Sequence, residues 1–174
     1  ADAIITNSGR IDAGDDGISS STGANATITN SGTIDAGDDG ILSTGADAII
    51  TNSGRIDAGD DGIYSSGAGS IITNSGSING AYGIVSNGAN AIITNSGTIT
   101  GTNYAIAGGT NDSLTLNLLK GSQLMGAIDL GGADVDNDTV NIHGGSVSAT
   151  LTLLNTENIN LLGPGLKLSG DVVA

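Results

Sequence analysis

Ile5-Thr6-Asn7-Ser8-Gly9 is the stretch that decides the fold, because the same five residues return four more times along the chain. The later copies begin at Ile28, Ile50, Ile72 and Ile93, so successive copies start 23, 22, 22 and 21 residues apart. Self-similarity at a nearly fixed period of about 20 to 50 residues is typical of solenoids and other repeat architectures. The repeated part is therefore expected to be a series of similar units rather than one globular core.

Three positions of the unit hold isoleucine in every copy. The three columns are Ile5, Ile28, Ile50, Ile72 and Ile93; Ile11, Ile34, Ile56, Ile78 and Ile99; and Ile18, Ile41, Ile63, Ile84 and Ile106. Each isoleucine lies in a short extended run bounded by Gly, Ser, Asn or Asp, which is the pattern of a β-strand. The sequence therefore predicts an all-β fold, a right-handed parallel β-helix (solenoid) with three short strands per coil of about 22 residues and isoleucine inside.

A fourth column consists of Asn7, Asn30, Asn52, Asn74 and Asn95. Whether this column lies inside or at a corner, stacked amides are expected to form a hydrogen-bonded ladder along the axis. From about Thr110 the units become less regular, although alternating Leu and Val continue. We therefore predict regular coils over residues 1–110 and less regular coils of the same solenoid over residues 111–174.

The composition excludes several classes of protein. The 174 residues include no Phe, Trp or Cys and only three Tyr, so large aromatic groups cannot anchor a globular core. The 18 acidic and four basic residues give a net charge of −14, which argues against nucleic acid as a partner. No apolar run approaches the roughly 20 residues of a membrane helix.

The tandem Ile-Thr-Asn-Ser-Gly-(Arg/Thr/Ser)-Ile units resemble the passenger domains of bacterial autotransporters and related β-helical adhesins. The passage from Leu118 to Gly132 is similar to the coils that often precede the membrane-anchoring region of that family. The resemblance implies a β-helix that is exported through the outer membrane and displayed at the bacterial cell surface, often for adhesion. The chain begins within a repeat, so we expect a piece of a longer protein whose export signal and translocator barrel lie outside this sequence.

The strongest candidate site is a recurring acidic turn. Asp12, Asp15 and Asp16 return as Asp35, Asp38 and Asp39, and again as Asp57, Asp60 and Asp61. We call the paired turn residues Asp15, Asp16, Asp38, Asp39, Asp60 and Asp61 the acidic ribbon. Stacked like charges repel unless cations bridge them, and Ca²⁺ favours several carboxylate oxygens. The simpler interpretation is a solvated edge with no cofactor, in which aspartate serves the turns and prevents sheet aggregation.

In the next two coils Tyr82 and Tyr104 replace the Asp16, Asp39 and Asp61 column. Two stacked tyrosines beside a neutral surface suit a sugar ring or a partner protein, or merely cover a corner.

Three further features carry less chemistry. Residues 131–139 place carboxylates at alternate positions but lack the rest of an EF-hand or of a β-roll repeat, which favours an ordinary acidic turn. His143 is the only histidine and is expected to face solvent. Arg10 and Arg55 share a column near the aspartates, a combination that some β-helical polysaccharide lyases use.

The sequence thus predicts a non-enzymatic adhesin or rigid stalk that binds through its lateral surface to a host surface or matrix protein, a glycan or a neighbouring cell. A carbohydrate-active β-helix is the alternative, and ice binding through the column of Thr6, Thr29, Thr51, Thr73 and Thr94 is a weaker one, because a second regular threonine rank is missing. The open ends of a β-helix also predict end-to-end self-association.

Overall fold

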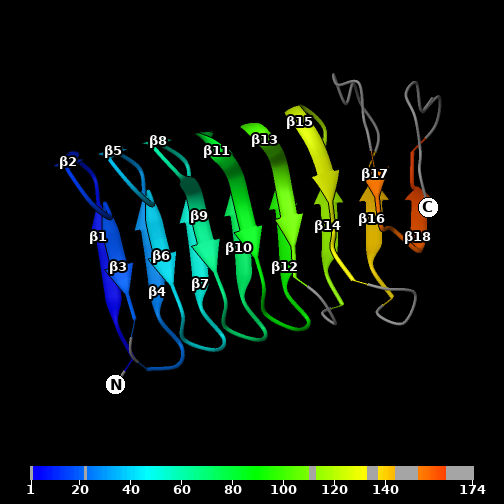
Figure 1. Cartoon of the computed structure of the whole chain (residues 1–174), viewed down its shortest axis with the longest axis horizontal. Coiled ribbons are helices and arrows are strands. Elements are labelled where there is room, and N and C mark those ends of the chain that lie inside the picture. Colours follow the sequence, from blue (N-terminus) through cyan, green and yellow to red (C-terminus); the bar gives the residue numbers. More distant parts are fainter. Residues whose placement is uncertain (1, 22, 110–112, 133–136, 144–152, 164–174) are drawn as a thin grey trace.

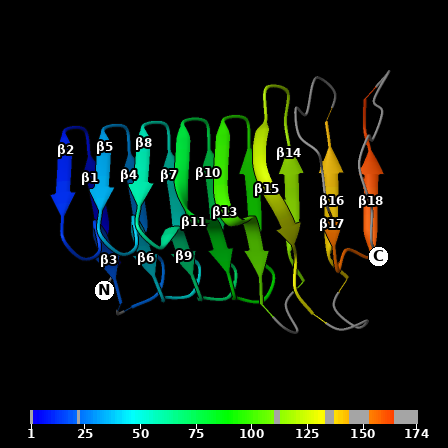
Figure 2. The same cartoon turned by 45° about the horizontal axis from the view of Figure 1, so that its top comes forward.

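The computed structural model describes residues 2–21, 23–109, 113–132, 137–143 and 153–163. In these ranges the chain forms eighteen β-strands and no helix, so the all-β prediction is confirmed. Successive coils lie side by side along one axis, from the N-terminal to the C-terminal end (Figures 1 and 2).

The first strand of each coil joins one parallel sheet of eight strands, which we call sheet A. Its members in order are β1 (Ile4–Asn7), β4 (Thr27–Asn30), β7 (Ile49–Asn52), β10 (Ile71–Asn74), β12 (Ile92–Asn95), β14 (Thr115–Leu118), β16 (Thr139–Ile142) and β18 (Asn158–Leu161). Because β12 pairs with β14, the ladder continues beyond the last Ile-Thr-Asn-Ser-Gly unit.

The second and third strands of the coils form the other sheet, sheet B. In the first three coils they are separate strands, namely β2 (Arg10–Ala13) and β3 (Ile18–Ser20), β5 (Thr33–Ala36) and β6 (Ile41–Ser43), and β8 (Arg55–Ala58) and β9 (Asp61–Ser65). In the next coils they merge into β11 (Ser77–Ser86), β13 (Thr98–Gly108) and β15 (Gln123–Asp129), and the short β17 (Leu153–Leu154) pairs with the end of β15.

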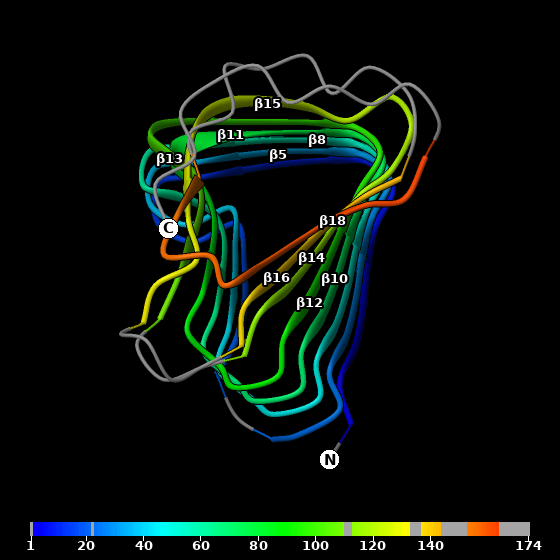
Figure 3. The ribbon, with the colours of Figure 1, turned by 90° about the vertical axis from the view of Figure 1, so that its right-hand side faces the viewer.

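Seen along its axis, the solenoid is three-sided (Figure 3). In this view from the C-terminal end the chain turns counterclockwise as it advances towards the viewer, so the β-helix is right-handed. The right-handed parallel β-helix is as predicted, and the predicted three separate strands per coil are present in the first three coils.

The three isoleucine columns are stacked in register and form the core. For example, Ile28 pairs with Ile50, Ile34 with Ile56, and Ile41 with Ile63, and all six side chains are fully buried. Burial of an isoleucine side chain stabilises a fold by about 1.5–3 kcal/mol, so three per coil are the main source of stability. Ile5 and Ile11 in the first coil are only partly buried, because they have a neighbouring coil on one side.

The asparagine column lies inside and forms the expected ladder. Asn7, Asn30, Asn52 and Asn74 each donate an Nδ2–H to the Oδ1 of the next asparagine at 2.8–2.9 Å, ending at Asn95. Because these amides are buried, each hydrogen bond also satisfies a polar group that water cannot reach. Four left-handed residues recur at another corner, where Asn25, Asp47, Gly69 and Asn90 have φ between 55° and 72°.

Candidate functional site

The acidic ribbon lies at the corner between the second and third strands of the first three coils. Each turn reads Ala-Gly-Asp-Asp-Gly-Ile, at residues 13–18, 36–41 and 58–63. The second glycine is required sterically, because a Cβ atom on Gly40 would lie 2.3 Å from Cγ2 of Ile56 in the next coil. The backbone of the turn therefore lies directly against a core side chain of the next coil.

The ribbon consists of an outer and an inner column that differ in burial. The outer aspartates Asp15, Asp38 and Asp60 are exposed. The inner column becomes more buried along the axis: Asp16 and Asp39 are half-buried, and Asp61 is only 8% exposed. The two columns therefore offer carboxylates at different depths of one corner.

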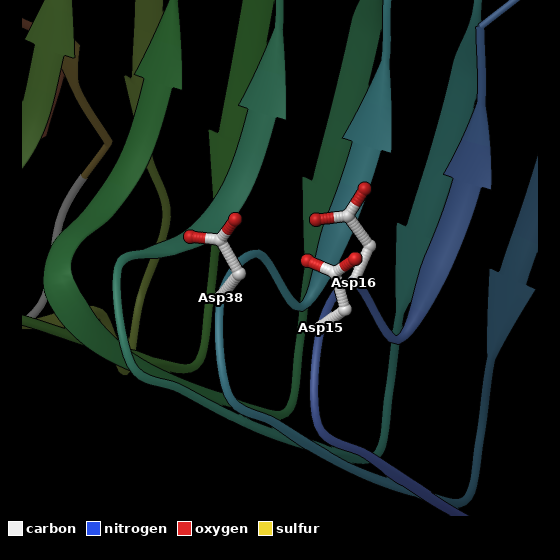
Figure 4. A group of neighbouring side chains, drawn as sticks. All are labelled: Asp15, Asp16 and Asp38. Atoms are coloured by element: carbon white, nitrogen blue, oxygen red, sulfur yellow. The ribbon is translucent and has the colours of Figure 1, made fainter.

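Stacking brings the carboxylates of adjacent coils close together. Oxygens of Asp15, Asp16 and Asp38 all lie within 4.8 Å of one another, and so do oxygens of Asp38, Asp39 and Asp60. Figure 4 shows the first group, in which the three side chains extend from the backbone on the same side. Oxygens at this spacing are close enough to share one cation, and without one they repel.

Two aspartates of the inner column, Asp39 and Asp61, have raised pKa values. Burial, together with the charges of Asp39, Asp60 and Asp38, raises the pKa of Asp61 to about 7. Burial also raises the pKa of Asp39, although the backbone N–H of Asp61 donates a hydrogen bond to Asp39 Oδ1 at 3.1 Å and acts in the opposite direction. Negative charge is therefore least well solvated at the end of the ribbon formed by Asp61.

Tyr82 and Tyr104 continue the inner column, as the sequence predicted. Asp61 pairs in register with Tyr82, and Tyr82 with Tyr104. The two rings stack with centroids 6.0 Å apart and planes inclined by 16°. Tyr82 therefore occupies the position next to Asp61 along the axis, which explains why the last aspartate of the column is the most buried one.

The arginines lie on the outer face of sheet B and pair with the strand aspartates. Arg10 Nη2 is 3.1 Å from Asp12 Oδ2 and 2.8 Å from Asp35 Oδ2, and Arg55 forms an ion pair with Asp57. None of these three ion pairs includes a turn aspartate of the acidic ribbon. The combination of arginine with the turn aspartates, which suggested a polysaccharide lyase, is therefore not formed by these ion pairs. The carbohydrate-active alternative stays a prediction.

The outer face of sheet A was only partly anticipated from the sequence. The predicted threonine column from Thr6 to Thr94 lies there, and in the later coils Asn117, Asn141 and Asn160 continue it as a second amide ladder, with Nδ2–Oδ1 distances of 2.9–3.0 Å. Two residues earlier in each strand, Ile49, Ile71 and Ile92 point outward and are 37–45% exposed. Side chains two residues apart in a strand point to the same face of the sheet, so the spacing from the threonines could have identified this outward row of isoleucines.

The remaining candidates have ordinary surroundings. His143 is exposed just after β16, as expected. Of the predicted acidic turn at residues 131–139, residues 133–136 lie outside the described part of the chain. Asp138 is buried and accepts a hydrogen bond from the N–H of Leu114 at 2.6 Å, a role that joins two coils and that the sequence did not reveal.

Comparisons of this chain with known protein families, with curated proteins and with solved structures gave no match. Among the described residues, no helix has the length and apolar character needed to cross a membrane.

Proposed function

We propose that this chain is a segment of an exported bacterial surface protein, similar to the autotransporter passengers that its repeats resemble, and that it acts as an adhesin or rigid stalk. In this proposal the parent protein is anchored in the outer membrane by a domain outside this sequence. The segment is displayed outside the cell and contacts a host surface or matrix protein, a glycan or a neighbouring cell.

A continuous hydrogen-bonded solenoid suits a stalk. Eight strands of sheet A at a spacing of about 4.8 Å extend the chain by roughly 34 Å along one axis. Each inner coil is held by buried aliphatic side chains and by backbone hydrogen bonds to both neighbouring coils, so bending would disturb many contacts at once. Such a unit transmits position and force without needing a binding cleft.

The single observation that carries the adhesive part is the outer face of sheet A. There Thr51, Thr73 and Thr94 lie in register beside the exposed Ile49, Ile71 and Ile92. Uncharged hydroxyl and apolar ranks on a broad sheet can contact a partner over many coils, with little charge to desolvate. The acidic corner, by contrast, is strongly negative and fits such contacts less well.

A matched pair of substitutions tests this proposal. Thr73→Lys places a charge in the middle of the sheet A rank, whereas Thr98→Lys places the same charge on the outer face of sheet B, where its in-register neighbours Ser77 and Gln123 are also neutral. The wild-type chain is applied to immobilised matrix proteins, glycans and cells, and retention is measured. We expect retention by at least one surface, a loss in Thr73→Lys and no change in Thr98→Lys.

Two outcomes would contradict parts of the proposal. Equal losses in both variants would mean that sheet A is not the contact face. Failure of every surface to retain the wild-type chain would remove the adhesive role and leave only the stalk.

A further inference from the structure

The outer face of sheet A is uncharged in a chain whose net charge is −14. None of its eight described strands contains an acidic or basic residue, and the charged residues of the described strands all lie in sheet B. The acidic corner is opposite sheet A in the three-sided cross-section (Figure 3). Two copies of the chain therefore repel each other least when their sheet A faces meet, because most of their like charges are then far apart.

The outward side chains of this face form two rows along the axis. Ile49, Ile71 and Ile92 lie in register in one row and are 37–45% exposed. Threonine occupies the other row in each of these coils, two residues further along the strand. Three adjacent isoleucines near the middle of an uncharged sheet favour a partner that covers them with apolar side chains.

The two rows are self-complementary when a second copy meets the face with its solenoid axis reversed. A twofold axis along the strand of Ile71 places Ile71 opposite its own counterpart and Ile49 opposite Ile92 of the second copy. Threonine then faces threonine, so hydroxyl groups can pair with one another. A second copy with the same axial direction would place isoleucine on threonine and bury hydroxyls without partners. At the rim, the reversed copy brings the neutral Asn90 opposite Asp47.

The size of the face indicates a weak association. In this register the seven strands of sheet A from β1 to β16 pair around β10. At about 4.8 Å per coil and about 3.3 Å per residue of a four-residue strand, the contact covers roughly 450 Å² of each copy. The total of about 900 Å² lies below the range of stable complexes, about 1,200–2,000 Å², and is typical of transient ones.

We propose that the outer face of sheet A is a self-association surface, to which a second copy of the chain binds with its axis reversed. This inference rests on the proposed contact role of sheet A and names the partner. Ile71 and Thr73 lie at the centre of the contact, where each meets its own counterpart. The acidic corners of both copies point away from it.

Sedimentation equilibrium of the whole chain tests the proposal. We expect a reversible monomer–dimer equilibrium that tightens as sodium chloride rises from about 0.05 M to about 0.5 M, because salt screens the net repulsion and the uncharged contact loses nothing. Thr73→Lys places two like charges opposite each other and should weaken the dimer by about tenfold or more at about 0.15 M salt. Thr98→Lys adds the same charge to sheet B and should leave the affinity within about twofold of the wild type.

An equimolar mixture of Thr73→Lys and Thr73→Glu tests the reversed pairing. Each variant repels its own copies across the twofold axis, whereas the mixture places lysine opposite glutamate and should recover the wild-type affinity. Recovery also shows that both variants are folded.

Three results would overturn the proposal. These are a wild-type chain that stays monomeric at every salt concentration, no recovery in the mixture, and equal affinities of Thr73→Lys and Thr98→Lys, which would indicate association through the ends of the solenoid. Retention on matrix proteins, glycans or cells is a separate measurement. If such a surface retains a wild-type chain that forms no dimer, the proposed function stands and the self-association does not.

Discussion

Two regions of one solenoid, the acidic coils (residues 4–65) and the tyrosine coils (residues 71–108), share a core and differ at one corner. Ile63 of the first region pairs with Ile84 of the second, and both are fully buried. At the corner, the acidic coils have two separate strands around a Gly-Asp-Asp-Gly turn, whereas β11 and β13 run through it continuously with a register shift. The comparison teaches that the core fixes the coil, while the corner is free to change its chemistry.

The largest expected effect tests the shared core. Ile63→Ala and Ile84→Ala each delete a fully buried side chain and should each lower the free energy of unfolding by about 2–5 kcal/mol. Urea unfolding followed by circular dichroism measures both. Since the core is the same in both regions, a cost confined to one of them would contradict the comparison.

The asparagine ladder crosses both regions and should give the next largest effect. Asn74→Leu leaves the Nδ2–H of Asn52 and the Oδ1 of Asn95 without their partners, at a cost of about 2–3 kcal/mol in the free energy of unfolding. The outward Thr73→Val on the same strand is the control and should change stability by less than about 0.5 kcal/mol. Similar stabilities for both variants would mean that the ladder contributes little.

The acidic coils should make stability depend on pH. The folded pKa of Asp61, about 7, lies above its ordinary value of 3.8, so the folded state binds a proton more tightly than the unfolded state does. In the absence of divalent cations, stability should therefore be highest near pH 4 and fall as pH rises to about 7. Solvent near Asp39 and Asp60 screens part of the interaction between these charges. We therefore expect the free energy of unfolding to fall by about 2 kcal/mol over this pH range.

Asp61→Asn is the control for this pH dependence, because it has no proton to lose. Melting temperatures between pH 4 and pH 7.5 should fall for the wild type and fall less steeply for the variant. Parallel curves would assign the pH dependence to the rest of the ribbon, whose inner member Asp39 also has a raised pKa.

The smallest effect concerns the tyrosine coils. Tyr104→Leu retains an apolar side chain but removes the ring stacked on Tyr82, and aromatic pairs contribute about 0.5–1.5 kcal/mol beyond their buried area. The melting temperature of Tyr104→Leu should be slightly lower than that of the wild type, and this difference should be the same at every pH between 4 and 7.5. A pH-dependent loss would mean that Tyr104 acts through the acidic corner.

The repeat made most of the fold predictable from sequence. Each isoleucine column could be read directly, because coils of equal length place copies side by side, and Asn30 was expected to form a ladder whether inside or at a corner. The burial of Asp61 could not be read in the same way. It depends on Tyr82 occupying the next position of the column despite a coil that is one residue shorter, and on how closely the backbone follows the core there.

The central claim is that every unit is one coil, stacked in register with the next from β1 to β18. The chain has no cysteine, so spin labels can be attached to cysteines introduced at Thr6 and Thr94, four coils apart, and at Thr6 and Asn160, seven coils apart. At about 4.8 Å per coil, pulsed electron paramagnetic resonance should give backbone separations of roughly 19 Å and 34 Å, in proportion to the number of coils. Separations that do not grow with the number of coils would contradict the stacked register.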